Sequence, residues 1–335
     1  MIFRARKKER RRKYLGTQLG KKGFTYLLVS TFITVALVIF FFATSSYKYR
    51  DQSALHEIRI RAMNDFVKNL DEDIHRASYI SAFRAMLAME DHVATTGQYV
   101  NDTNSTFREI FFYGTINGTQ SGIMLNSTFS DYLGRAQSLA AATGIILDIN
   151  VSKINIVQSS PWELTIYITM NVTIADTKKT AYWNITKTYS TDVPIENLRD
   201  PLYSKNTFNR VPNTIKIFNT TTLVNGTDVT NLEQYIDSSY YMASNESPSF
   251  IMRFEGRYDA DPNGIESIVD VRDLSDQDIE IDHNAVKIDY IYFNNLPSTK
   301  VCNVQNVDSD YYFVIPQNRT GMYQISGLNY STSCP

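Results

Sequence analysis

The sequence predicts an α+β protein in which an N-terminal transmembrane helix is extended by a long amphipathic helix and packs on an antiparallel β-sheet ectodomain. Three observations support this fold class. Residues 24–44 contain no charged residue and no Asn, Gln, Gly or Pro. Residues 54–92 lack Gly and Pro and repeat apolar side chains at helical spacing. Residues 164–174 alternate apolar and polar side chains, which is typical of a half-buried strand.

The first expected element is a transmembrane helix over residues 24–44. A bilayer core needs about 20 apolar residues in a helix, and this segment has 21. Residues 1–23 carry ten Lys or Arg and one acid, Glu9. Because basic flanks stay on the cytoplasmic side, we expect a cytoplasmic N-terminal tail in the cell membrane, with the C-terminal ectodomain outside.

The charge of the exterior part limits its partners. Beyond the tail the chain has 23 basic and 34 acidic residues, a net charge of −11. Nucleic acid is therefore not an expected partner, since binding its phosphate backbone needs a cationic face. The basic tail lies beside the span, where contact with anionic lipid head groups makes the lipid bilayer the expected partner.

Residues 45–98 are expected to extend the helix outward. Its apolar positions fall three to five residues apart, and Gly97 with the Asn/Thr-rich residues 101–106 is expected to end it. The pattern allows either one continuous helix or a break near residues 44–47. The apolar positions are Leu55, Ile58, Met63, Phe66, Leu70, Ile74, Ala77, Ile80, Phe83 and Leu87.

Residues 99–200 predict a shorter helix followed by antiparallel sheet. The helix is expected over residues 130–142, and the alternating strand covers residues 164–174. Asp176–Lys179 forms a turn, after which Trp183, Ile185 and Tyr189 share one face of the next strand. This region is therefore read as a helix packed beside a hairpin.

The C-terminal part divides into an irregular segment, residues 201–248, and a second antiparallel β region, residues 249–335. Four strands are expected in the latter, at residues 250–254, 286–293, 311–315 and 322–325. Cys302 and Cys334 are expected to form a disulfide that contributes about 3–4 kcal/mol, since both lie in the exterior part. Two free thiols are the alternative.

Potential N-glycosylation sites are abundant. Of 26 exterior Asn residues, 12 lie in Asn-x-Ser/Thr sequons, whereas the Ser and Thr content predicts between four and five by chance. This excess indicates a glycosylated surface protein, the alternative being a surface that is simply rich in Asn and Thr. The sites are Asn101, Asn104, Asn117, Asn126, Asn150, Asn171, Asn184, Asn219, Asn225, Asn245, Asn318 and Asn329.

We find no pattern of catalytic or cofactor-binding residues, and we expect no enzymatic activity and no cofactor. The four His residues lack the four-residue spacing of paired metal ligands, so a structural or solvated role is expected for each. Neither a Cys-x-x-Cys pair nor a Gly-x-Ser-x-Gly nucleophile motif is present. The His residues are His56, His75, His92 and His283.

One segment has the spacing of a calcium-binding loop. Residues 259–270 place oxygen-bearing side chains at loop positions 1, 3, 5 and 12, with Gly264 at position 6. Pro262 at position 4 and the lack of a preceding helix favour a tight turn instead, and no metal site is favoured. The candidate ligands are Asp259, Asp261, Asn263 and Asp270.

Tyrosines are frequent in the C-terminal part. Exposed together, they would form a platform for sugars or for adhesion, but half-buried strand positions are the favoured interpretation. The residues considered are Tyr240, Tyr241, Tyr290, Tyr292, Tyr311 and Tyr312.

The junction Lys21-Lys22-Gly23 followed by Phe24-Thr25-Tyr26-Leu27-Leu28 resembles the class III signal of archaeal and bacterial type IV pilin-like proteins. The resemblance implies that a prepilin-type peptidase cuts between Gly23 and Phe24 and leaves the apolar helix on the mature chain. That family usually carries Glu at the fifth position after the cut, where Leu28 stands.

The exterior part is similar to uncharacterised archaeal membrane-anchored surface proteins with pilin-like N-termini. Together the two resemblances imply a pilin-like architecture and a non-enzymatic role as a subunit or component of a surface structure, with self-assembly or other surface proteins as partners. The alternative is an anchored receptor or adhesin that binds a surface ligand through residues 194–335. The segments that carry the exterior resemblance are residues 161–162, 200–203, 262–267 and 289–293.

Overall fold

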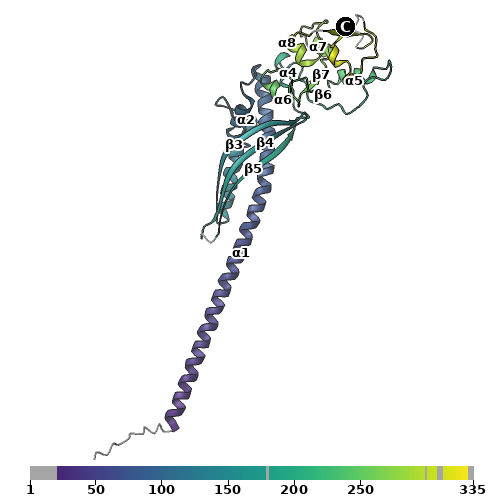
Figure 1. The fold of residues 1–335 in the computed structure, drawn as a ribbon. Helices are drawn as coiled ribbons and strands as arrows, with labels where there is room; N and C mark the ends of the chain where they lie inside the picture. Colours follow the sequence, from purple (N-terminus) through teal and green to yellow (C-terminus); the bar gives the residue numbers. More distant parts are fainter. Residues whose placement is uncertain (1–20, 179–180, 299, 308–311, 331–335) are drawn as a thin grey trace, which may run out of the picture. The chain divides into compact units, whose positions relative to one another are not determined.

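The computed structural model describes residues 21–178, 181–298, 300–307 and 312–330. Predictions on the tail 1–20, the side chain of His56, Tyr311 and Cys334 lie outside these residues. The chain divides into two units, residues 1–64 and 65–335, which are described separately. Within the described residues the protein is α+β, with an apolar N-terminal helix and antiparallel sheets (Figure 1).

Helix α1, Lys21–Thr96, is a continuous helix of 76 residues that runs through residues 44–47 without interruption. The predicted helical extension is therefore confirmed, and of its two predicted forms the continuous one is present. Gly97 follows with φ +65°, a left-handed conformation that Gly adopts without steric cost, and ends the helix as expected.

A small helical layer follows α1 in the second unit. Its elements are α2 (Thr103–Tyr113), β1 (Thr115–Ile116), β2 (Thr119–Gln120), η1 (Gly122–Met124) and α3 (Phe129–Ala142). The carboxylate of Asp102 caps α2, and Thr128 with Asp131 forms a capping box at α3. Because Phe107, Phe111 and Phe129 stack in sequence in the core, α2 and α3 are held together.

The main sheet has three antiparallel strands in the order β3–β4–β5, with bounds Ile145–Ser160, Glu163–Asp176 and Tyr182–Pro194. The central strand β4 buries its alternating apolar residues, as its sequence pattern predicts. Strand β3 adds a third strand to the predicted hairpin and carries a bulge between Val151 and Lys153. The buried residues of β4 are Leu164, Ile166, Ile168, Met170, Val172 and Ile174.

The sheet packs against the part of α1 that lies in the second unit (Figure 1). Lys187 Nζ on β5 lies 2.5 Å from Asp71 Oδ1, and the rings of His75 and Tyr189 meet edge to face at 5.3 Å. The helix buries Ala82, Met86 and other residues of its apolar stripe completely. The part of α1 that lies in the second unit is therefore covered by the unit's own residues.

The C-terminal half is built from short elements. The helices are α4 (Pro201–Asn206), α5 (Thr230–Asp237), α6 (Phe250–Phe254), α7 (Val271–Asp276) and α8 (Asp289–Asn294), followed by η2 (Gln317–Arg319). Two antiparallel pairs join β6 (Tyr241–Ala243) to β7 (Ile265–Ser267) and β8 (Val301–Val304) to β9 (Phe313–Pro316).

The strand predictions for residues 249–335 are largely wrong. Residues 250–254 and most of 286–293 are the helices α6 and α8, residues 322–325 form a turn, and only the 311–315 prediction overlaps a strand, β9. Segment 201–248, expected to be irregular, contains α4, α5 and β6. Apolar runs of four to eight residues fit a buried helix as well as a strand. In this half of the protein the runs at residues 250–254 and 289–294 are buried as helices.

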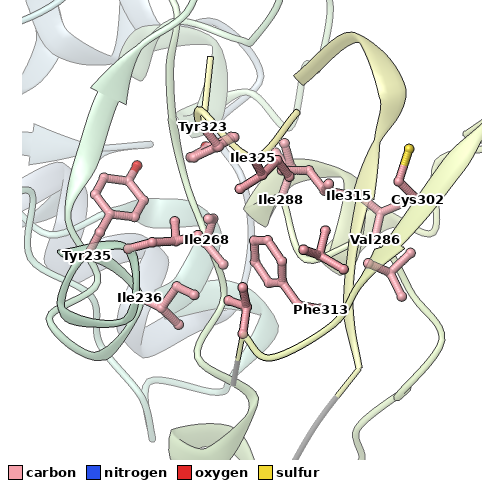
Figure 2. Packing of buried hydrophobic residues seen from close by; sticks show 14 of the residues in the cluster. Tyr235, Ile236, Ile268, Val286, Ile288, Cys302, Phe313, Ile315, Tyr323 and Ile325 are labelled. Atoms are coloured by element: carbon pink, nitrogen blue, oxygen red, sulfur yellow. The ribbon is translucent and has the colours of Figure 1, made fainter. Parts of the chain in front are cut away.

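One hydrophobic cluster holds this half together (Figure 2). It joins Tyr235 and Ile236 of α5 to Ile268, Ile288 and the strands β8 and β9, with Phe313 and Ile315 buried at its centre. Cys302 is fully buried in the same cluster and is disulfide-bonded. Since Cys334 lies outside the described residues, its pairing with Cys302 stays a prediction.

A tight turn at Asp261–Gly264 joins this half to the sheet. The carboxylate of Asp261 accepts from the Asn263 backbone N–H at 2.8 Å, and Gly264 N–H donates to the Asp261 carbonyl at 2.9 Å. The side-chain amides of Asn263 and Gln158 each donate to the other residue's backbone carbonyl at 2.9 Å. These contacts form the turn that the sequence favours over a calcium loop.

Substitution of Gly264 by Ala is expected to destabilise the fold by about 2–3 kcal/mol. A Cβ at this position would collide with the backbone carbonyl oxygens of Ser244 and Ser247, which cannot move independently of the chain. Gly327→Ala is the control, because a Cβ there meets no atom within 4 Å. Chemical denaturation of the two variants measures the difference, and equal stabilities would contradict the packing described for this turn.

Candidate functional site

The apolar segment of α1 is the first candidate functional element. Residues Gly23–Ser45 form one helix long and apolar enough to cross a membrane, and none of its most apolar window is buried within the protein. At 1.5 Å per residue these 23 residues span about 34 Å, close to the thickness of a bilayer core. Side chains such as Phe32, Leu37 and Phe41 are exposed by more than 60%.

Polar side chains in this segment bond to its own backbone. The hydroxyls of Thr31, Thr34 and Thr44 donate to carbonyl oxygens three or four residues earlier in the helix. In a hydrocarbon environment a polar group needs an internal partner, and these bonds supply one for the three threonine hydroxyls. Gly23 and Phe24, the predicted processing residues, lie inside α1, with Phe24 65% exposed.

A polar cleft in the second unit is the other candidate. It has a volume of about 650 Å³ and lies between the end of α1, helix α2 and strand β3 at its bulge. A second cavity of about 380 Å³ shares His92, Ile116 and Asn117 with it. The side chains at the cleft include His92, Tyr99, Arg108, Phe112, Tyr113 and Lys153.

The cleft is lined by two basic side chains without an ion pair among the described residues and by two carboxylates that already accept hydrogen bonds from the protein. Arg108 and Lys153 are exposed and form no ion pair with any residue in the described ranges. Asp102 caps α2, whereas Glu109 Oε1 accepts from Thr115 Oγ1 at 2.8 Å and from the Gly118 N–H at 2.9 Å. Burial raises the pKa of Glu109, but these hydrogen bonds outweigh it and leave the pKa lowered.

The C-terminal half contains a buried ionic cluster centred on Arg253. Its guanidinium Nη1 lies 2.5 Å from Asp200 Oδ2 and 2.8 Å from Asp289 Oδ2, and all three side chains are fully buried. Tyr241 donates to Asp200 at 2.8 Å, and Ser267 donates to Asp289 at 3.0 Å through its hydroxyl. The cluster therefore joins α4, α6, α8 and β7.

A third buried carboxylate, Glu266, lies on β7 directly before Ser267. Glu266 accepts from Arg319 Nε at 3.1 Å and from the Tyr323 hydroxyl at 3.0 Å. Burial raises the pKa values of both Glu266 and Asp200. Within the described chain these groups are enclosed and hydrogen-bonded, which assigns them to the architecture of the fold rather than to a ligand site. Three of the segments that carry the exterior resemblance, residues 200–203, 262–267 and 289–293, meet here.

Glu90 on α1 is a buried carboxyl that sequence reasoning missed. It is 4% exposed, and its Oε1 atom has no hydrogen-bond partner. Burial raises its pKa to about 8, although a hydrogen bond from the Arg199 backbone opposes the shift. Glu90 follows Met86 by four residues and precedes Val93 by three, and both of these residues are fully buried. This helical spacing places Glu90 on the buried face of α1 and could have predicted its burial.

Replacement of Glu90 by Gln is expected to flatten the pH dependence of stability. The folded pKa lies above the unfolded value of 4.5, so this group lowers the free energy of unfolding as pH rises from about 5 to about 8, by up to about 1.4 kcal/mol per pH unit. The variant should therefore be more stable than the natural protein at about pH 8. Urea unfolding between about pH 5 and pH 8 measures the difference in the free energy of unfolding between the variant and the natural protein. Glu72→Gln is the control, because Glu72 lies on the exposed face of α1.

The calcium-loop candidates do not form a common site. Asp259 is exposed and lies 3.8 Å from Arg257, Asp261 and Asn263 form the turn, and the carboxylate of Asp270 caps α7 at Arg272. Among the described residues, no group of three or more His, Cys, Asp or Glu side chains is placed to hold a metal ion.

The tyrosines do not form a common platform, which was the less favoured interpretation, and Tyr290 and Tyr292 lie in helix α8 instead of the expected strand. Tyr241 and Tyr290 are buried, Tyr240 and Tyr292 are half-buried, and Tyr312 is exposed by 56%. His92 borders the cleft, while His75 packs on Tyr189. Of the sequon asparagines, Asn104 and Asn171 are half-buried and the other ten are exposed.

Comparisons with protein-family models, with curated protein sequences and with solved structures find no match. The function of the chain is therefore inferred from its own geometry.

Proposed function

We propose that this chain is a non-enzymatic, single-pass surface protein whose apolar helix is both membrane anchor and assembly element, in the manner of a pilin-like subunit. The observation that supports this proposal best is the uncovered apolar segment Gly23–Ser45, which follows the basic junction at Lys21-Lys22-Gly23. Exposed apolar area of this extent in water would drive association, so the segment requires lipid or other helices around it.

The second unit supports a pilin-like architecture. The second half of α1 packs along a three-stranded antiparallel sheet, which leaves the first half of the helix without a covering element in its own unit. The basic tail would lie in the cytoplasm and the sheet outside. In this proposal the partners are the bilayer, further copies or other surface proteins, and a prepilin-type peptidase that cuts before Phe24.

Proteinase digestion of intact cells, followed by mild detergent extraction and sedimentation, tests the proposal. We expect the folded part to be accessible from outside and the extracted protein to sediment as an assembly. Protection of the folded part from external proteinase would contradict the proposed orientation. A monomer that retains Met1 would contradict assembly.

An anchored receptor or adhesin is the second candidate, and the polar cleft of about 650 Å³ favours it. A cavity of this size accommodates a small ligand. Its lining comes from α1, α2, β3 and the β1–β2 hairpin, so the ligand would bind there and not through residues 194–335. A retained tail with a monomeric, ligand-binding ectodomain would favour this candidate over assembly.

A further inference from the structure

We propose that Asn117 carries an N-linked sugar chain whose first residues lie in the cleft between α1, α2 and β3, so that the protein covers this cleft with its own carbohydrate. The proposal rests on the outward placement of the second unit in the proposed function. It adds a defined modification site and a defined occupant for the cleft.

The structure separates the sequons by the availability of the side-chain nitrogen. Asn104 Nδ2 donates to Asn155 Oδ1 at 2.7 Å and to the Ile156 carbonyl at 3.0 Å, so both of its hydrogens are used. Asn171 Nδ2 is likewise bonded to Asn184 Oδ1 at 2.9 Å and to Thr186 Oγ1 at 3.1 Å. Attachment of a sugar to Nδ2 at either residue would break native contacts.

Asn117 differs from Asn104 and Asn171 in both exposure and position. It is exposed, no described residue bonds its Nδ2, and it lines both the larger and the smaller cavity. It stands at φ +50° in the Asn-Gly turn between β1 and β2. Because the Glu109 carboxylate holds the N–H of Gly118, the turn is fixed to α2 and directs residue 117 to the cavity border.

The cleft suits a carbohydrate in size and lining. Its volume of about 650 Å³ is in the range that holds a ligand of drug size, which corresponds to a short oligosaccharide. Tyr113 is 65% exposed and packs edge to face with Phe112 at 4.9 Å, which offers ring surface for the apolar face of a sugar. Arg108 and Lys153 supply uncommitted donors for sugar hydroxyls.

The modification requires a sugar donor that the cell supplies, an oligosaccharide linked through phosphate to a membrane lipid. A bond forms between Asn117 Nδ2 and the anomeric carbon, and the bond from that carbon to the phosphate oxygen breaks. The lipid phosphate leaves with the electron pair, and Nδ2 loses one proton. Thr119 completes the sequon and is exposed.

Glycopeptide mass spectrometry and hydrogen–deuterium exchange on the full-length protein from its native membrane test the proposal. We expect sugar on Asn117 and an unmodified Asn104. In Thr119→Val, which keeps Asn117 but destroys its sequon, we expect amides of residues 108–120 to exchange about tenfold faster or more, because the covering sugar is lost. Asn117→Gln should give the same result.

Asn126→Gln is the matched control, because Asn126 is also an exposed sequon residue at positive φ, +56°, but does not line the cleft. We expect the amides of residues 108–120 to exchange at the same rate in Asn126→Gln as in the natural protein. Sugar on Asn126 or Asn150 but none on Asn117 would overturn the proposal and leave the outward placement intact. Unchanged exchange in Thr119→Val, or no sugar at any sequon, would also overturn it, and the proteinase experiment decides separately on placement.

Discussion

Replacement of Arg253 by Met is expected to lower the free energy of unfolding by about 3–5 kcal/mol. Met fills similar volume but leaves the carboxylates of Asp200 and Asp289 buried without their cation, since both oxygens contact Arg253 Nη1. It also removes the donor to the Ile265 carbonyl on β7. Urea unfolding of the detergent-solubilised full-length protein measures the loss.

Arg257→Met is the control for this prediction. Arg257 lies four residues later, is 57% exposed and pairs with Glu255 at 3.3 Å, so its loss should cost about 1 kcal/mol or less. The deficit of Arg253→Met should shrink toward acid pH, because burial raises the pKa of Asp200 and protonation of this carboxyl removes an unpaired buried charge. A deficit that is the same at all pH values would show that lost packing, not lost pairing, is the cause.

The second large effect is expected from two charges in the apolar helix. Ile33→Arg combined with Leu37→Arg should release the protein from the membrane into the carbonate-soluble fraction. The segment has 13 Leu, Ile, Phe or Val residues between positions 24 and 44, each favouring insertion by about 0.3–0.6 kcal/mol, while each central Arg opposes it by about 2.5–3.5 kcal/mol. Two Arg residues oppose insertion by about 5–7 kcal/mol, which is comparable to the roughly 3–7 kcal/mol that the 11 remaining apolar residues contribute, so the net preference for the membrane is lost.

Ile58→Arg provides the comparison, because Ile58 is also an exposed apolar residue of α1, at 64%, but lies outside the span. It should remain in the membrane fraction. Release of both variants, or of neither, would contradict the assignment of residues 23–45 as the anchor. Circular dichroism of the released protein checks that the second unit is still folded.

The sequence predicted the parts of the fold whose signal is local. Helix α1 and Gly97 at its end are confirmed, as are the helix at residues 130–142 and the alternating strand β4, but Ile58 and Ile80 of the predicted apolar face of α1 are 64% and 56% exposed. The periodic pattern of each of these helices and of the strand extends over ten or more residues, which is long enough to distinguish helical from strand spacing. Helix α5 also had a local signal in Leu232, Tyr235 and Ile236, three buried residues at helical spacing.

The ionic cluster could not be predicted in this way. Arg253 is enclosed by Asp200 and Asp289, which are 53 and 36 residues away in sequence. Its run Phe250–Phe254 fits a strand with one polar position, whereas the structure buries both faces and forms α6. The cleft is similarly non-local, since its walls come from α1, α2, β1 and β3, although the sequon at Asn117 was visible in the sequence.

The most direct test of the proposed function is the N-terminal residue of the protein purified from its native membrane, determined by mass spectrometry of the terminal peptide. We expect the peptide to begin at Phe24, which would place the apolar helix at the start of the mature chain, as in a pilin-like subunit. A peptide that begins at Met1 would contradict that account and leave a signal-anchored ectodomain whose ligand remains to be found.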